Sequence, residues 1–351
     1  MSKKILLFLL LLGFAYCLPA QDQHFTQFYA SPISLNPALT GSLQGKYRFS
    51  VIYRDQWKNV LQNPYVTYSG AIDFRFRMSP YRKKLDDSFG VGVIFYSDKV
   101  PFIGYSNNQI FLSGAFHKSL SDQNNQFLSI GGQVGLAQRN INYGNINFGD
   151  QFNGDNGYTN GTDEILPENN FAHSDFNVGI NYAYAPADKV GFFIGASMHH
   201  ILEPQISFFY DNDNPDKFPE DRLAAKYVGH MTFQIPMGPN VQMLPRALVY
   251  SQGPHLAINA GTNFRFLVDD VKGVAIHLGS WVRPVKNELD VFFMDSVVGM
   301  VGLELNNFLL GLSYDANIND LNQSRRGQGA FEISIAYLGE YDDETVLCPK
   351  F

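Results

Sequence analysis

The residues most able to bind a metal ion or move a proton in this sequence are its eight histidines, of which His199 and His200 are adjacent. A metal site needs ligands that converge on one point. Because neighbouring residues of a strand point to opposite faces, the pair would be a poor chelate, and we predict no metal site there. No nucleophile motif, phosphate-binding loop or dinucleotide fingerprint is present. The sequence therefore predicts a protein that is not an enzyme, with no catalytic residues.

Two polar stretches, residues 141–171 and 200–224, are rich in Asp, Asn and Gly. Oxygen ligands of this kind suit calcium, but neither stretch has the spacing of an EF-hand loop. A solvated loop needs the same residue types for its turns. No cofactor is predicted, and calcium in one of these loops stays open as the alternative.

The first twenty residues have the three parts of a secretory signal peptide. Two lysines are followed by an apolar run and by a tolerable cleavage site that ends at Ala20. The run is too short to span a bilayer as a stable helix. A lipoprotein signal that acylates Cys17 is the alternative, but Tyr16 stands before it, where a small residue is expected. We expect export through a cleaved signal peptide, residues 1–20.

Cleavage would leave Cys348 as the single cysteine, because the sequence has only one other. The mature chain then has no internal disulfide framework and no cysteine-rich metal site. A lone exported thiol near the end of the chain either pairs with another chain or stays free, and the sequence leaves both open.

Composition narrows the class of protein before any element is assigned. Aromatic residues make up 15% of the chain and charged residues only 17%, against about 25% in ordinary soluble domains. No apolar stretch after residue 20 approaches the length of a membrane helix. The net charge of −7 argues against nucleic-acid binding, which needs a basic face. These features are typical of strands that are apolar on one side only.

Alternation of apolar and polar residues is the main signal along the chain. Between residues 65 and 78, Val66, Tyr68, Ile72, Phe74 and Phe76 fall on one side of a strand, and the other side carries Thr, Ser, Asp and Arg. Successive side chains of a strand point to opposite faces, so this segment has one greasy and one charged face. The same pattern predicts fourteen strands: 46–57, 65–78, 88–98, 106–118, 126–140, 172–185, 188–199, 225–236, 241–251, 254–267, 272–284, 296–306, 308–317 and 329–340.

The lengths of the connections are a second signal. Numbered in order, connections 5, 7, 11 and 13 are the longer ones, and the even connections after residue 126 are short. Outer-membrane barrels alternate short periplasmic turns with longer extracellular loops, and bacterial ones have an even number of strands. The pattern therefore predicts a barrel with both chain ends in the periplasm.

The greasy face could in principle point inward, as in a soluble β-sandwich. A closed barrel of about fourteen strands is too wide to be filled by its own side chains, since about eight strands reach that limit. Its lumen should be polar and its outer face apolar, which matches the alternation. Closure also removes strand edges, which lipid does not tolerate. We predict an all-β fold, an antiparallel outer-membrane β-barrel.

Residues 21–45 lie outside the strand pattern and before the first strand, on the predicted periplasmic side. They contain prolines and the aromatic residues Phe25, Phe28 and Tyr29. The segment either hangs free or folds into the lumen as a plug. Burial of aromatic residues is favourable, so a docked segment is expected.

Several short motifs occur in a fixed order along the chain. They include the run 329–334 and the residues Gln27, Phe28, Tyr29, Asn36, Pro37, Gly41, Arg54, Gln56, Trp57, Tyr314, Asp315 and Cys348. Found together and in order, these motifs resemble the PorP/SprF family of type IX secretion system membrane proteins from Bacteroidetes. The resemblance covers essentially the whole mature chain. We take these twelve residues as candidates for a partner-binding or structural motif.

The resemblance implies an outer-membrane barrel of the secretion or gliding motility machinery. Its expected partners are a secreted surface adhesin or other cargo protein and periplasmic or outer-membrane secretion subunits, with no nucleic acid. The implied organisation is a signal peptide (1–20), a periplasmic or plug segment (21–45), a transmembrane barrel (46–340) and a periplasmic tail (341–351).

Two other functions remain as alternatives. One is a passive porin or a FadL-like transporter of small hydrophobic molecules, because the Asn36-Pro37-Ala38 run is similar to a segment of fatty-acid transport barrels. The other is a barrel enzyme, which should show a Ser-His or Asp-His constellation near one membrane face. The sequence offers no candidate for such a constellation.

Overall fold

The computed structural model describes Asp22 and residues 24–58, 61–78, 85–186, 189–209, 221–286, 291–318 and 329–339. The predicted signal peptide 1–20 and the predicted tail 341–351 with Cys348 lie outside these residues. In the described part of the chain, none of the helices has the length and apolar character needed to span a bilayer.

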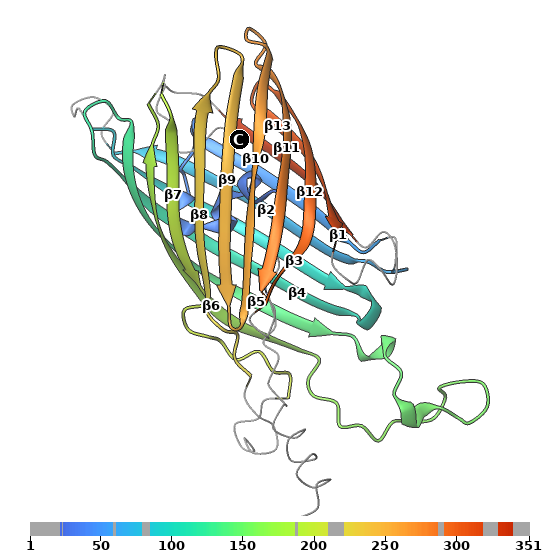
Figure 1. The fold of residues 1–351 in the computed structure, drawn as a ribbon. Coiled ribbons are helices and arrows are strands. Elements are labelled where there is room, and N and C mark those ends of the chain that lie inside the picture. Colours follow the sequence, from blue (N-terminus) through green and yellow to red (C-terminus); the bar gives the residue numbers. More distant parts are fainter. Residues whose placement is uncertain are drawn as a thin grey trace, which may run out of the picture.

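The fold is a closed antiparallel barrel of fourteen strands, as the sequence predicted (Figure 1). Each strand pairs with its neighbours in sequence, and β14 pairs with β1 to close the ring. The strands are β1 Tyr47–Gln56, β2 Tyr65–Arg77, β3 Ser88–Val100, β4 Tyr105–Ser119, β5 Gln126–Ile141, β6 Asn170–Tyr184, β7 Gly191–His199, β8 Lys226–Pro236, β9 Val241–Gln252, β10 His255–Asp269, β11 Val274–Lys286, β12 Phe292–Leu305, β13 Phe308–Asn317 and β14 Gly329–Gly339.

The greasy face of the strands points outward and the polar face points into the barrel. In β2, Tyr68, Ile72, Phe74 and Phe76 are exposed, whereas the intervening polar residues are buried, among them Asp73. The same alternation continues around the ring, so the outer surface is a band of large apolar side chains. This arrangement suits lipid outside and a polar interior.

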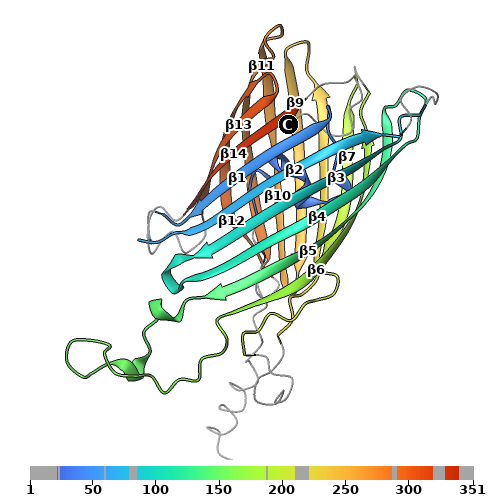
Figure 2. The same ribbon diagram turned by 180° about the vertical axis from the view of Figure 1, so that it is seen from behind.

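The two ends of the barrel differ in their connections. Connections that follow even-numbered strands are short along much of the ring, such as 237–240, 270–273 and 306–307. The long connection 142–169 follows β5 and leaves the barrel at the opposite end, where Figures 1 and 2 show it reaching well away from the wall. We call the end with the connections that follow even-numbered strands the even end. The opposite end, with the connections that follow odd-numbered strands, is the odd end.

Connection 11 is shorter than the sequence suggested. The predicted strand began at residue 296, but β12 begins at Phe292 and the connection is 287–291. The register shifts between Arg283 and Pro284, where β11 pairs with β12. Proline donates no hydrogen bond to a ladder, so a strand accommodates it at an irregularity of this kind. The proline and the irregular register obscured the pattern at this end of the hairpin.

The outward position of Leu312, near the middle of β13, gives a direct test of the lipid face. We expect Leu312→Arg to destabilise the barrel by about 2–4 kcal/mol, because a cation on the lipid face near the bilayer centre is costly. The control Leu312→Ala keeps the position apolar and should cost less. Urea unfolding in phospholipid vesicles measures both. An arginine variant within about 0.5 kcal/mol of the parent, as on a solvated surface, would contradict a membrane location.

Candidate functional site

Residues 24–46 together with Asp22, called the luminal segment below, lie inside the ring of strands (Figures 1 and 2). The segment forms three short turns of helix, η1 Phe28–Ala30, α2 Pro32–Leu35 and η2 Pro37–Leu39. Prolines stand at the start of the second and third turns, where a missing N–H costs nothing. Asn36 caps the third turn, because its side chain accepts a hydrogen bond from the Ala38 N–H.

The luminal segment is more deeply buried than most of the wall around it. Among its residues, Gln27, Asn36, Ala38 and Thr40 have no exposed surface. The sequence favoured a docked segment, and these contacts agree with that expectation. Closure of the lumen to solutes stays a prediction.

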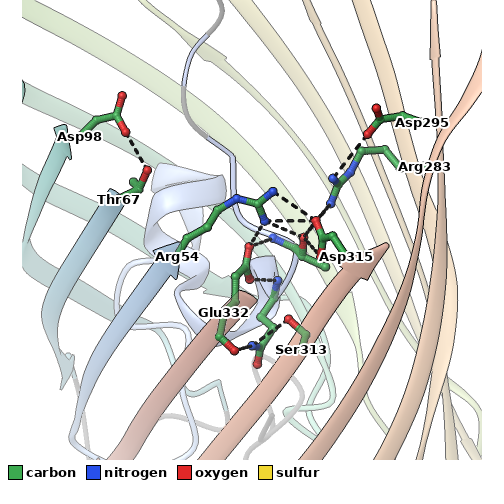
Figure 3. A network of polar contacts seen from close by, with 10 residues as sticks. Arg54, Thr67, Asp98, Arg283, Asp295, Ser313, Asp315 and Glu332 are labelled. Carbon is green, nitrogen blue, oxygen red and sulfur yellow. Dashed lines mark hydrogen bonds and ion pairs between the residues drawn. The ribbon is translucent and has the colours of Figure 1, made fainter. Parts of the chain in front are cut away.

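A buried charged cluster holds the start of the luminal segment (Figure 3). It comprises Arg54 of β1, Arg283 of β11, Asp315 of β13 and Glu332 of β14, none more than 4% exposed. Arg54 forms ion pairs with both Glu332 and Asp315. Arg283 lies 2.9 Å from Asp315. Two cations and two carboxylates therefore neutralise one another where water is scarce.

The luminal segment contributes directly to this cluster. The Glu332 carboxylate accepts hydrogen bonds from the backbone N–H of Thr26 at 2.6 Å and of Gln27 at 2.9 Å. The Thr26 hydroxyl donates to Asp315 at 2.7 Å and accepts from Arg283 at 2.6 Å. Hydrogen bonds to charged groups are the stronger class, with net values of about 1.5–3 kcal/mol. The cluster thus fixes the segment to β1, β11, β13 and β14 together.

A second buried ion pair holds the other end of the segment. Arg48 of β1 and Asp73 of β2 lie 2.7 Å apart. The Gly41 N–H donates to Asp73 at 2.7 Å, and Arg48 donates to the Leu39 carbonyl at 3.2 Å. Gly41 has φ of 70°, a left-handed conformation that glycine adopts without a steric penalty. The chain turns there toward β1.

Asn36 attaches the middle of the segment to the opposite wall. Its side-chain amide lies within hydrogen-bond distance of the Ile180 carbonyl at 3.0 Å, the Ala196 carbonyl at 3.2 Å and His230 Nε2 at 3.0 Å. An isosteric aspartate could not donate these bonds. Asparagine is therefore required for both its donor and its acceptor, since the acceptor caps η2.

Glycines on four strands allow the backbone of the segment to approach the wall. A Cβ at Gly131 of β5 would fall 2.5 Å from the Pro37 backbone. Gly90, Gly179 and Gly311 would collide in the same way with Thr40, Asn36 and Gln27. These positions are inward-facing and small because the segment occupies the space of a side chain.

Aromatic contacts complete the docking. The Tyr29 ring is stacked on Trp281 of β11 with 6.0 Å between centroids, and the Arg246 guanidinium lies 3.9 Å from its centre. Phe28 packs with Val228 and Leu248. Cation–π contacts contribute about 2 kcal/mol or more when they are desolvated.

The pair His199 and His200 is arranged differently from the prediction. His200 follows the end of β7 with φ of 56°, so the alternation of a strand no longer applies, and both imidazoles are buried inside the barrel. His200 Nδ1 lies 2.6 Å from Asp175, and Nε2 lies 2.6 Å from Asp22. Burial lowers the pKa of His200, but the charge of Asp22 and hydrogen bonds to both aspartates outweigh it and raise the pKa to about 9. His200 therefore forms an ion pair with Asp22 at neutral pH.

No group of three or more His, Cys, Asp or Glu residues in the described ranges is arranged to hold a metal ion. In the connection 142–169, Asp150 accepts hydrogen bonds from Thr162 and from the Asp163 N–H. The Asn153 side chain likewise accepts from the backbone N–H of Asp155. These oxygens stabilise turns of the loop. The absence of a cofactor stays a prediction, with calcium in residues 141–171 or 200–224 as its alternative.

Most of the residues singled out in the sequence meet at the luminal segment. Eight of the twelve lie on it or contact it: Gln27, Phe28, Tyr29, Asn36, Pro37, Gly41, Arg54 and Asp315. Pro37 begins η2 and lies against Gly131.

Three of the singled-out residues lie elsewhere. Gln56 pairs with Ala330 across the β1–β14 seam, and the Trp57 N–H donates to the Gly329 carbonyl. Tyr314 points outward and is 43% exposed. These three belong to the closing seam and the outer face, and not to the luminal contacts.

Sequence reasoning missed several residues that hold the segment. Arg283, Asp73 and His230 were not singled out, although each contacts it, and neither was Asp22, which lies on the segment and binds His200. Single charged residues among the small and polar residues of an inward strand face were a usable signal for such positions. The partner of each such charge lies far away in sequence, so the pairing itself could not be read.

A family model described as the type IX secretion system membrane protein PorP/SprF matches residues 18–337. No curated protein matches the sequence. Among solved structures, the CymD monoaromatic hydrocarbon channel is 8% identical, with 90% of this chain and 94% of that chain covered and a TM-score of 0.48.

Two further solved structures have lower scores. A FadL homologue from Pseudomonas aeruginosa is 10% identical, covers 86% and 92% of the two chains and has a TM-score of 0.44. The translocator domain of the autotransporter NalP from Neisseria meningitidis is 10% identical, covers 89% and 93%, and has a TM-score of 0.36. These likenesses concern the barrel form alone.

Removal of Arg54 tests whether the charged cluster holds the segment. Arg54→Ala leaves Glu332 buried without its cation, and loss of one partner of a buried pair costs about 3–5 kcal/mol. In a Trp57→Phe background, Trp281 is the single tryptophan and reports on its stacking with Tyr29. We expect lower stability in urea and altered Trp281 fluorescence.

The matched control is Lys58→Ala, which removes a cation that is 75% exposed and lies 3.6 Å from Asp55. Exposed pairs contribute about 0–1 kcal/mol, so this variant should resemble the parent. Equal stability and equal fluorescence for the Arg54 and Lys58 variants would show that the cluster does not hold the segment.

Proposed function

From the premise that the chain belongs to the PorP/SprF family of type IX secretion system membrane proteins, we propose that it is a non-enzymatic barrel that acts by binding other proteins. The partners are a secreted surface adhesin or another cargo protein, together with periplasmic or outer-membrane subunits of the secretion or gliding machinery. Export through a cleaved signal peptide into the outer membrane is part of the proposal.

The occupied lumen is the observation that carries this proposal. A passive channel of this width needs a water-filled path, but here buried side chains of the luminal segment contact β1, β2, β6, β11, β13 and β14. The segment is fixed by charge pairs, by hydrogen bonds and by glycines that admit its backbone. When the luminal segment occupies the interior, the rims and the long connections are the surfaces left to bind other molecules. Surfaces of this kind suit protein partners.

The second candidate is uptake of small hydrophobic molecules, and one observation favours it. A cavity of about 70 Å³ lies beside the luminal segment and is partly open to solvent. Its lining is partly aromatic and aliphatic, including Phe25, Phe28, Phe111, Val228 and Leu248. Apolar linings with a few polar groups are typical of small-molecule sites.

Crosslinking in outer membranes tests the protein-binding function. A tagged chain is crosslinked and purified, and its partners are identified by mass spectrometry, with a tagged unrelated barrel as the control. We expect a large secreted surface protein or secretion subunits that the control lacks. Deletion of the gene should abolish surface display of that same protein. Recovery of the barrel alone, together with normal display of surface proteins, would refute the proposal.

Conductance separates the two candidates. In a planar bilayer the intact protein should show no steady open pore, because the luminal segment fills the ring. A chain that lacks residues 22–45 should conduct, provided that its heat-dependent gel mobility shows a folded barrel. A large and steady conductance of the intact protein would favour the channel function instead.

A further inference from the structure

The start of the luminal segment contacts the odd end of the barrel. The Asp22 carboxylate lies 2.6 Å from His200, which directly follows β7, and 3.5 Å from Lys226, the first residue of β8. The Asp22 N–H donates to the side chain of Gln252, the last residue of β9, at 3.0 Å. All three partners flank connections that follow odd-numbered strands.

The other end of the segment lies at the even end. Leu43 packs in a buried cluster with Leu309, near the start of β13, and Leu338, near the end of β14. The Lys46 N–H donates to the carbonyl of Gly339, the last residue of β14. The start of β13 follows the short connection 306–307, and the end of β14 lies at the same end of the barrel.

Other contacts lie between these two points. Thr26 and Gln27 meet Asp315 and Glu332 in the odd half of β13 and β14. Leu35 still lies toward the odd end, because its carbonyl oxygen is 3.2 Å from Nε2 of His199, the last residue of β7. Asn36 meets Ile180 and Ala196 in the interior of β6 and β7, and Gly41 reaches Gly90, near the start of β3 at the even end. The chain therefore reaches the even end mainly between Asn36 and Gly41.

We infer that the luminal segment threads the barrel from end to end, so that the mature N-terminus leaves at the odd end, beside the long connection 142–169. The sequence predicted that residues 21–45 start from the side where the first strand begins, either hanging free or folded into the lumen. Lys46 lies at that end of the barrel, but Asp22 is anchored at the opposite end.

The contacts of Asp22 fix the start of the luminal segment at the odd end of the barrel. Its carboxylate is held by His200, and Asp175 contacts the other ring nitrogen of the same histidine. Lys226 adds a second cation, which also lies 5.8 Å from the centre of the Tyr250 ring. With the long connections outside the cell, the N-terminus becomes part of the surface that faces an extracellular partner. The inference itself concerns only which end of the barrel the N-terminus leaves.

Cysteine labelling with a membrane-impermeant maleimide tests the path. In a Cys348→Ser background, Gln21→Cys and Gln23→Cys report on the N-terminus. Glu168→Cys, in the connection 142–169, marks the odd end, and Lys272→Cys, in the connection 270–273, marks the even end. Each variant is labelled on intact cells, after permeabilisation and after unfolding.

We expect the N-terminal cysteines to react under the same condition as Glu168→Cys. Reaction under the condition that exposes Lys272→Cys, or only after unfolding, overturns the inference. Because the two markers are compared on the same barrel, the result does not depend on which end faces outward. It is also independent of the proposed protein-binding function, which the crosslinking experiment tests separately.

Discussion

A closed ring of fourteen strands is wider than its own side chains can fill, and the rest of this structure depends on that constraint. The polar inner faces would otherwise surround open water. Here residues from the N-terminus occupy the space, and the wall is shaped to receive them: Gly131 and Gly179 leave room for the backbone at Pro37 and the Asn36 side chain. The described interior of the barrel is thus built from two parts of one chain, the strands and the luminal segment.

Buried charge determines where the luminal segment can lie. Two arginines and two carboxylates in the wall would be costly to bury singly, and their mutual pairing offsets that cost only when the remaining hydrogen-bond capacity is also satisfied. Thr26 and the Gln27 N–H supply this capacity for Asp315 and Glu332. Because Arg54 lies on β1 and Glu332 on β14, the same contacts stabilise the seam at which the barrel closes. Docking of the segment and closure of the ring therefore support each other.

The strands could be predicted from the sequence because alternation is a local signal, and a two-sided environment of lipid and lumen imposes it on every strand. It failed at the start of β12, where the pairing with β11 shifts register beside Pro284. It also failed at His200, where a single left-handed residue ends the alternation and leaves its imidazole on the same inward side as that of His199. Resemblance to a family identified Gln27, Asn36, Arg54 and Asp315 as a set, but no local rule pairs Thr26 with Asp315. Such contacts are set by the three-dimensional path of the segment, which has no periodicity to read.

The division between wall and segment bears on function through accessibility. A residue such as Arg54, enclosed by carboxylates and by the luminal segment, cannot meet a partner protein while the segment is docked. Most of the residues singled out in the sequence contact the luminal segment in this way, so under the proposed function the features that select a partner lie at the ends of the barrel. The connection 142–169 is the most extended of the described connections, and it carries no basic side chain but five acids. Among its exposed apolar residues, Phe152 and Tyr158 face each other in an isolated β-bridge, and Ile165 lies in an irregular stretch. Function resides in sites carried by a fold and not in the fold itself, so under the proposed function the choice of a secreted protein depends on such exposed side chains and not on the barrel wall.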